Sequence, residues 1–173
     1  MDFRRKNIRL PRTAYLGRHW YFLTTGTEGR TPILNKVDLV QELLAILADR
    51  AVAARSGIQA YCFMPDHLHL LVSGTEDNSD CMAFINSFKQ KSGFAFKQRN
   101  RKRLWQHKSY DHILRPGDPW ESVAYYIWMN PVRKSLCAEP QDWPHSGSET
   151  VDWKRLLAPP EKLWTPPWKK QSK

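Results

Sequence analysis

Two histidines stand out as side chains that could do chemistry together. His67 and His69 are two residues apart in an apolar segment, and in an extended strand this spacing puts both imidazoles on one face. Two neighbouring imidazoles can ligate one divalent ion. A single histidine on a strand is usually structural, whereas a pair on one face is less often accidental. The pair therefore predicts a metal site, with Leu68, Leu70 and Val72 facing the core.

A second candidate pair lies further along the chain. Tyr126 and Asn130 are four residues apart, the spacing that stacks two side chains on one helix face. A carboxamide oxygen is an acceptable hard ligand, and a phenol one turn earlier would hang over the same ion. Pro131 deprives the Ile127 carbonyl of its donor and predicts a kink. Simple packing of a helix that ends at Asn130 explains the spacing equally well, so both interpretations stay open.

Cys62 offers another interpretation of the histidines, because Cys62, His67 and His69 could bind zinc across a turn. No C-x-x-C pair completes a familiar zinc set. The motifs of zinc-dependent deaminases are missing, and so are the Gly- and Phe-rich stacking motifs of RNA-binding ferredoxin-like modules. We expect Asp66 to shape the turn rather than bind metal. The lone histidines His107, His112 and His145 are expected to be structural or solvated.

The elements that must position these residues follow from local patterns. Strands are expected at 20–25, 58–63, 67–72 and 109–114, and helices at 36–55, from Asp80 onward, and from an Asp118 cap with Pro119 in the first turn. The order is β-α-β-β-α-β followed by one more helix. This predicts an α+β fold: a ferredoxin-like antiparallel sheet with an additional C-terminal tyrosine-bearing helix.

Positive charge is concentrated in two blocks of this 173-residue chain, whose net charge is +10. Residues 81–110 carry eight Lys and Arg and no acid, and residues 1–20 carry six basic residues against one acid. Such blocks attract phosphate backbones, and aromatic rings surround the second one, as suits single-stranded nucleic acid. A merely solvated, solubilising surface is the simpler alternative.

The composition also limits where the chain works. A hydrophobic fraction of 41% supports a packed core, and no apolar run is long enough for a membrane-spanning helix. The first residues lack the apolar stretch of a secretory signal. Cys62, Cys81 and Cys137 have no disulfide-framework spacing, which favours a reducing compartment. We therefore expect a cytoplasmic, nucleoid-associated protein.

Several segments resemble the small single-tyrosine HUH transposases. Residues 61–72, with the sequence YCFMPDHLHLLV, are similar to the HUH strand of that family, and residues 126–133, YIWMNPVR, are similar to its tyrosine helix. Segments 105–106, 110–115 and 143–146 match the branch called REP-associated tyrosine transposases. The resemblance runs from about Tyr15 to Ser148. It divides the chain into a basic N-terminal arm (1–18), an HUH transposase-like catalytic domain (19–148) and a Pro/Trp-rich tail (149–173).

The resemblance implies a role for each site residue. His67, His69 and Asn130 would be metal ligands for Mg²⁺ or Mn²⁺, with Zn²⁺ less favoured, and Tyr126 would be the nucleophile. The activity implied is metal-assisted transesterification of single-stranded DNA through a 5′-phosphotyrosine, which needs no ATP and so no P-loop. A domesticated DNA-hairpin-binding protein without turnover is the alternative.

The implied substrate is a palindromic extragenic hairpin, bound by a monomer, with a dimer as the other option. The two basic segments are the candidates for contacting its phosphates. The residues expected to do so are Arg4, Arg5, Lys6, Arg9, Arg12, Lys97, Arg99, Arg101, Lys102 and Arg103.

Overall fold

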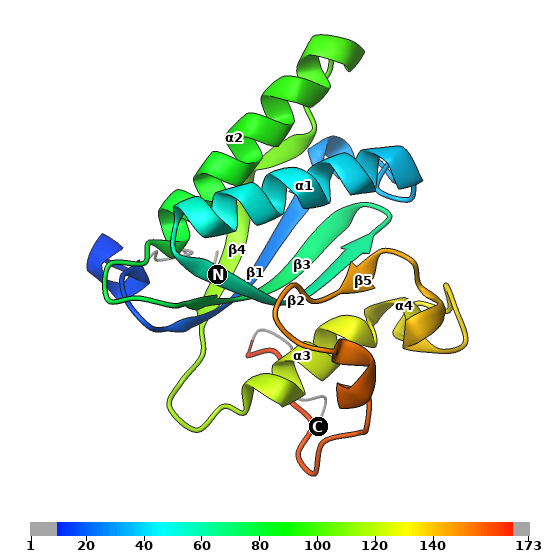
Figure 1. Ribbon diagram of the computed structural model, residues 1–173. Helices are drawn as coiled ribbons and strands as arrows, with labels where there is room; N and C mark the ends of the chain where they lie inside the picture. The colour runs from blue at the N-terminus through cyan, green and yellow to red at the C-terminus, as the bar shows by residue number, and fades with distance from the viewer. Residues whose placement is uncertain (1–9, 168–173) are drawn as a thin grey trace, which may run out of the picture.

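The chain folds around one antiparallel sheet with the strand order β4-β1-β3-β2-β5, as the computed structural model of residues 10–167 shows (Figure 1). All four strand pairs are antiparallel. The strands are β1 (Trp20–Thr27), β2 (Ser56–Met64), β3 (His67–Gly74), β4 (Trp105–Ile113) and β5 (Ser146–Gly147). The predicted ferredoxin-like α+β fold is confirmed, with the short β5 as an unpredicted fifth strand.

Helices cover both faces of this sheet. The α-helices are α1 (Val37–Ala53), α2 (Cys81–Asn100), α3 (Trp120–Trp128) and α4 (Asn130–Arg133). Figure 1 shows α1 and α2 together on one side of the sheet and α3 and α4 on the other. We call these two sides the α1–α2 face and the α3 face. No helix within residues 10–167 is long and apolar enough to cross a membrane.

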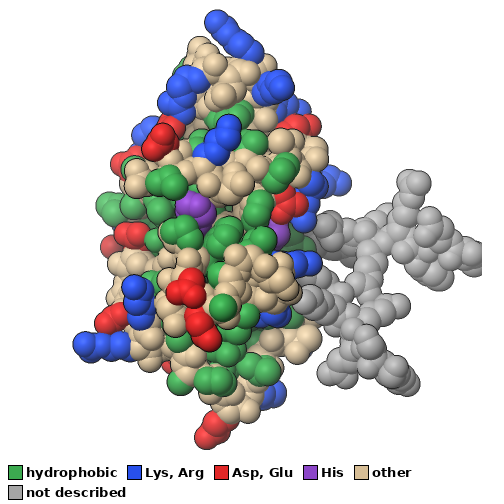
Figure 2. Space-filling view, turned by 90° about the vertical axis from the view of Figure 1, so that its right-hand side faces the viewer, with side chains coloured by type: hydrophobic (Ala, Val, Ile, Leu, Met, Phe, Trp, Pro, Cys, Tyr) green, Lys and Arg blue, Asp and Glu red, His purple; other side chains and the backbone are tan. Residues whose placement is uncertain are grey.

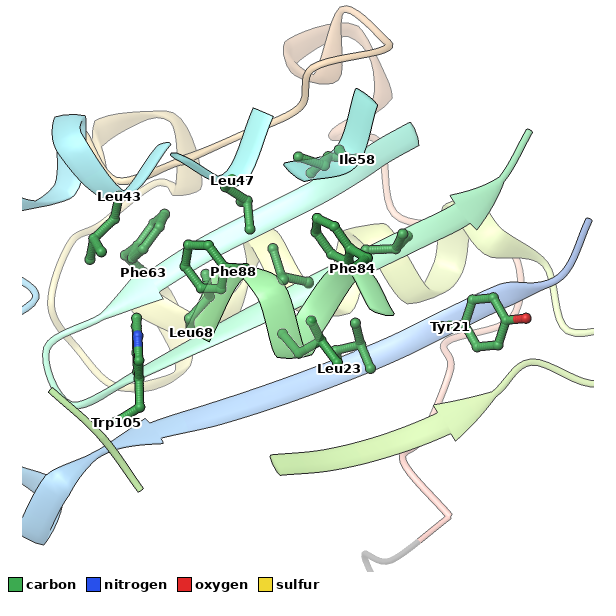
Figure 3. Close-up of a cluster of buried hydrophobic side chains, with 14 of the residues drawn as sticks. Tyr21, Leu23, Leu43, Leu47, Ile58, Phe63, Leu68, Phe84, Phe88 and Trp105 are labelled. Carbon is green, nitrogen blue, oxygen red and sulfur yellow. The ribbon is translucent and has the colours of Figure 1, made fainter. Parts of the chain in front are cut away.

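The α1–α2 face holds the larger core. Leu68 and Leu70 of β3 point into it and pack with Phe84 and Phe88 of α2, all of them at most 1% exposed (Figure 3). Side chains alternate along a strand, so this apolar row places the residues between on the other face. Burying one such side chain stabilises the fold by roughly 1.5–3 kcal/mol. The predicted apolar row of β3 is therefore confirmed.

The α3 face has a smaller cluster. Leu71 of β3 packs there with Ile127 and Trp128 of α3. The C-terminal segment after β5 lies over the same face, where Trp153 and Trp164 pack against the cluster. The predicted division of the chain at residues 18 and 148 stays a prediction.

The predicted helix starts were right for α2 and wrong for α3. The Asp80 side chain accepts a hydrogen bond of 2.8 Å from the Ala83 amide and caps α2. Helix α3 instead begins at Trp120 without a side-chain cap. The Asp118 carboxylate accepts a hydrogen bond of 3.0 Å from the Arg115 amide, so it closes the preceding turn.

Candidate active site

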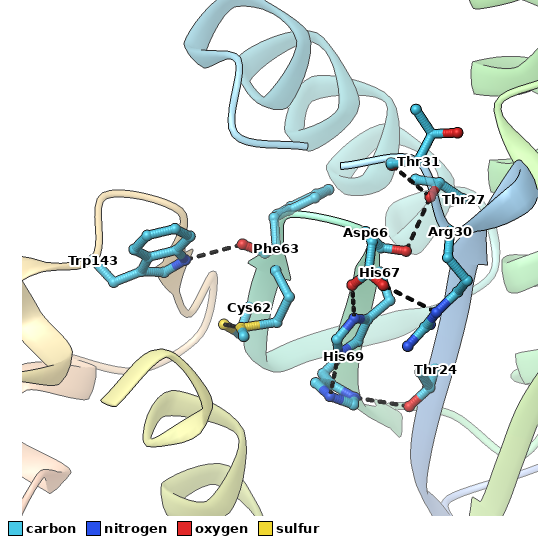
Figure 4. Close-up of polar contacts among 11 residues, drawn as sticks. Thr24, Thr27, Arg30, Thr31, Cys62, Phe63, Asp66, His67, His69 and Trp143 are labelled. Carbon is cyan, nitrogen blue, oxygen red and sulfur yellow. Dashed lines mark hydrogen bonds and ion pairs between the residues drawn. The ribbon is translucent and has the colours of Figure 1, made fainter. Parts of the chain in front are cut away.

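The two histidines meet at the start of β3, on the α3 face. Their Nε2 atoms are 3.0 Å apart, and the two rings are almost perpendicular. Each Nδ1 is engaged elsewhere: that of His67 lies 2.5 Å from Asp66 Oδ1, and that of His69 lies 2.8 Å from Thr24 Oγ1 (Figure 4). Each ring is therefore held with its Nε2 directed at the other histidine.

This is the length of a hydrogen bond between the two rings, and the same spacing fits two ligands of a single cation. Bonds from a metal to imidazole nitrogen are about 2.0–2.1 Å long, so two such ligands at a right angle lie about 3 Å apart. Burial lowers the pKa of the His67 imidazole, although the Asp66 carboxylate acts in the opposite direction. The neutral imidazole is the form that binds a metal.

The sequence led us to expect that Asp66 only shapes the turn. In the structure its side chain also contacts His67 and Arg30. Its second oxygen lies 3.0 Å from Nε of Arg30, so the carboxylate links that guanidinium to His67. Carboxylates in this position orient a metal-binding histidine and raise its basicity. Sequence reasoning missed this role and the role of Thr24. The signal available for Asp66 was an acidic residue directly before the histidine pair.

Phe22 of β1 connects the histidines to the tyrosine helix. Its ring centroid lies 5.5 Å from that of His69 and 6.2 Å from that of Tyr126. The helix itself packs through Val123, Ala124 and Ile127, which are fully buried on the sheet. Tyr126 and the histidines therefore share one face, with the two rings on either side of Phe22.

A break follows the tyrosine helix at the predicted proline. Pro131 has no N–H for the Ile127 carbonyl, and α3 ends at Trp128. The side-chain nitrogen of Asn130 donates to that carbonyl at 3.2 Å and to the carbonyl of Tyr126 at 3.1 Å. The nitrogen is thereby committed to the backbone, so only Oδ1 of this buried amide can serve a cation. Whether Asn130 is a ligand stays a prediction.

Arg133 and Trp164 hold the Tyr126 ring. The guanidinium carbon of Arg133 lies 4.1 Å from the ring centroid, and its Nη2 donates to the Tyr126 carbonyl at 2.6 Å. The indole of Trp164 meets the same ring edge-on at 5.1 Å. Tyr125, Tyr126, Arg133 and Trp164 line a cavity of about 540 Å³ between α3 and the C-terminal segment. Sequence reasoning missed both neighbours of this ring.

The alternative zinc site at Cys62 is contradicted. Within residues 10–167 no group of three His, Cys, Asp or Glu side chains is placed to hold a metal. The Cys62 thiol is fully buried and contacts Met64 Sδ at 3.6 Å, and burial raises its pKa to about 12.

The basic residues fall into three groups. Arg4, Arg5, Lys6 and Arg9 lie outside the described residues. Two others have acidic partners: Arg12 pairs with Asp80 at 2.9 Å, and Arg99 pairs with Glu42. The rest have no such partner within residues 10–167 and lie at the end of α2 and just after it: Lys97, Arg101, Lys102 and Arg103. Figure 2 shows Lys and Arg side chains gathered at the top of the molecule, where α2 ends in Figure 1.

Known proteins resemble this chain over most of its length. An Escherichia coli REP-associated tyrosine transposase is 23% identical over 147 residues, which cover 79% of this chain and 85% of that protein. A Haemophilus influenzae protein named for the same group is 28% identical over 98 residues, which cover 50% of this chain and 56% of that relative. The chain thus spans little more than half the length of the second protein.

A solved structure supports the fold. It is the structure of a REP-associated tyrosine transposase bound to a REP hairpin, with a TM-score of 0.71 at 22% identity, covering 89% of this chain and 88% of that one. The family model described as "Transposase IS200 like" matches residues 16–128, a stretch that includes the histidine pair and Tyr126. The resemblance inferred from the motifs is thereby confirmed. The chain belongs to the IS200-like transposase family.

Proposed function

We propose that this chain is a single-stranded DNA endonuclease and strand transferase that acts on palindromic repeat hairpins through Tyr126. The observation that carries the proposal is the convergence of two Nε2 atoms, 3.0 Å apart, on the sheet face that also carries Tyr126. Relatives named for REP elements and the family match support the choice of DNA as substrate.

The reaction exchanges one phosphodiester for another. The Tyr126 hydroxyl gives up its proton, and its oxygen attacks phosphorus while the bond from phosphorus to the 3′ oxygen breaks. The 5′ end stays on Tyr126 as a phosphotyrosine, and the released strand takes up a proton to end in a 3′-hydroxyl. The reverse attack by a 3′-hydroxyl rejoins DNA and frees the tyrosine, so no ATP is consumed.

The residues around the tyrosine would prepare this step. His67 and His69, with Oδ1 of Asn130, would hold Mg²⁺ or Mn²⁺, with Zn²⁺ as the less favoured ion. When bound, the ion would polarise the scissile phosphate and offset the charge that develops on its oxygens. Arg133 stacks on the Tyr126 ring and bonds to its backbone, which restricts the ring to one plane. We further propose that the chain acts as a monomer.

Covalent trapping tests this function. The full chain is incubated with a hairpin oligonucleotide in the presence of Mn²⁺, and the products are separated on a denaturing gel. We expect an adduct that keeps a label placed at the 3′ end of the DNA, because Tyr126 stays joined to the 5′ phosphate of the fragment downstream of the cut. Tyr126→Phe should abolish the adduct, and the neighbouring Tyr125→Phe should preserve it.

The second candidate function is hairpin binding without turnover. It is favoured if wild-type protein binds the hairpin but forms no adduct with any of the three ions. An adduct that survives in Tyr126→Phe would contradict the assignment of the nucleophile.

A further inference from the structure

A groove of about 470 Å³ runs between α2 and β4, away from the tyrosine helix. Its walls combine amides, cations, the exposed imidazole of His107 and the exposed ring of Phe94, and none of the residues lining it is acidic. Among the residues that line it are Gln90, Phe94, Lys97, Arg103, Trp105 and Gln106.

The basic side chains on the two sides of α2 differ in whether they have an acidic partner. On the side toward α1, Lys91 pairs with Asp49 at 3.2 Å, and Arg99 pairs with Glu42. On the side of the groove, Lys97 and Arg103 have no acidic partner within residues 10–167. Unpaired cations beside a groove without acids attract a chain of phosphates and release its counterions.

Phe94 adds a feature that phosphate binding alone does not explain. Its side chain is 65% exposed, and it is the one aromatic residue among the large apolar residues exposed within residues 10–167. A ring on a basic groove offers a stacking platform for a base, and a base can stack on it only when it is outside a duplex. The ring therefore favours a single strand over a double helix as the occupant.

The groove is held in shape by hydrogen bonds between α2 and β4. Lys89 of α2 donates through Nζ to the carbonyls of Gln106 and His107, at 2.8 and 3.1 Å, where the pairing of β4 with β1 is irregular. The floor is formed by Trp105, whose Nε1 donates to Ser92 Oγ at 2.8 Å. Both walls are thus fixed before a ligand binds, which lowers the entropic cost of binding.

The edge strand β4 separates the groove, on the α1–α2 face, from the histidines on the α3 face. Gly26 of β1 is the register partner of His67, and β4 flanks β1 on the other side. A Cβ at Gly26 would lie 2.9 Å from Oε1 of Gln106 and 3.2 Å from Nη1 of Arg30. The Gln106 side chain therefore lies over Gly26, between the groove and the ion pair of Arg30 with Asp66. With strands about 4.8 Å apart, β4 is roughly 10 Å from β3.

We propose that the α2–β4 groove binds a single-stranded DNA segment. Lys97 and Arg103 contact its phosphates, and Phe94 stacks on one of its bases. The inference deepens the proposed function, because it names a second surface on which the chain holds single-stranded DNA. The binding itself does not require that function to be correct.

Fluorescence anisotropy tests the proposal, with a labelled oligothymidine of about twelve nucleotides and a duplex of the same length. All variants are made in the full chain carrying Tyr126→Phe, so that no covalent product forms. Phe94→Ala should weaken single-strand binding by about 5- to 150-fold, and Phe94→Trp should restore it. Val52→Ala removes an apolar side chain that is 79% exposed on α1 and is the matched control.

Salt dependence tests the charges. Lys97→Gln combined with Arg103→Gln should lower the slope of log K against log salt by about 1.4, since each phosphate contact on a single strand contributes about 0.7. Lys91→Gln, a change on the opposite side of the same helix, should leave the slope unchanged.

Three results would overturn the inference. The first is that Phe94→Ala binds the single strand as tightly as Val52→Ala does, and the second is that the double variant of Lys97 and Arg103 changes the salt slope no more than Lys91→Gln does. The third is that Phe94→Ala weakens duplex binding as much as single-strand binding. These outcomes are separate from the adduct test. A chain that binds the single strand in this groove but forms no adduct would refute the proposed function and leave the groove assignment standing.

Discussion

The α1–α2 face of the sheet is covered by helices of 17 and 20 residues, whereas the α3 face is covered by a nine-residue helix and an irregular C-terminal segment. The same strands contribute side chains to both faces. β3 contributes Leu68 and Leu70 to one, and His67 and His69 to the other. The first face is an apolar core, and the second surrounds polar side chains with smaller apolar contacts.

The two faces therefore have different roles: the α1–α2 face stabilises the fold, and the α3 face carries the candidate catalytic residues. Long helices bury a continuous apolar surface and leave few polar groups between them and the sheet, such as Ser92 of α2. A short helix with irregular chain beside it leaves room for two imidazoles, an amide and a phenol near the surface. We therefore expect substitutions on the α1–α2 face to act mainly on folding, and those on the α3 face to act mainly on metal and DNA.

Substituting the adjacent leucines of β3 should have the largest effect on the free energy of unfolding. Leu70→Ala removes a side chain between the sheet and the two long helices and should lower the free energy of unfolding by about 4 kcal/mol. Leu71→Ala, on the α3 face, should cost nearer 2 kcal/mol, because the short helix and the C-terminal segment can close part of the cavity. Urea denaturation of both variants measures the two costs. Equal costs would show that the faces are equally rigid.

The contacts behind the histidines should affect metal binding rather than folding. Asp66→Asn removes the carboxylate charge beside His67 Nδ1, and Thr24→Val removes the hydroxyl that bonds to His69 Nδ1. Each should weaken Mn²⁺ binding by about 10- to 100-fold, or roughly 1.4–2.8 kcal/mol, because such partners orient the ligand. Calorimetric titration with Mn²⁺ measures the loss. Asp77→Asn, which alters an exposed pair with Arg18, is the control and should bind Mn²⁺ as the wild type does.

Much of the site was predictable because its geometry is local. Alternation along β3 was enough to place His67 and His69 together and Leu68 on the opposite face. Proline chemistry was enough to predict the break at Pro131, although not that the Asn130 side chain would supply the missing donor. These features depend on residues within one helical turn or one strand of each other.

The unpredicted contacts depend on how distant segments return to the sheet. Trp164 reaches Tyr126 through a proline-rich segment with no periodic pattern. Arg133 reaches the same ring from α4, beyond the break at Pro131. The predicted Asp118 cap was wrong because its carboxylate finds the nearer amide of Arg115. Patterns of residue type carry no information on such competing partners.

Substitutions at the starts of α2 and α3 should change the free energy of unfolding by less than the leucine substitutions do. Asp80→Ala removes the cap of α2 and should lower the free energy of unfolding by about 1 kcal/mol. Asp80→Asn keeps a capping oxygen while removing the ion pair with Arg12, so it should cost less. Asp118→Ala, at the uncapped start of α3, should cost a few tenths of a kcal/mol. Thermal unfolding of the three variants ranks them, and an Asp118 cost as large as that of Asp80 would contradict the helix starts described above.

The smallest expected effect is the acid sensitivity of the segment that closes the edge of β2. His145 is 6% exposed, its carbonyl accepts a hydrogen bond from the Phe63 amide, and burial lowers the pKa of its imidazole below the ordinary value of 6.5. Below about pH 6.5 the unfolded chain therefore takes up a proton more readily than the folded chain, and the free energy of unfolding should fall as the pH drops. Burial lowers the pKa of His67 and His112 as well, so His145→Asn should flatten this slope only in part. Urea midpoints between pH 5 and pH 8 measure the slope. An unaltered slope in His145→Asn would mean that the proton uptake of His145 is the same in both states.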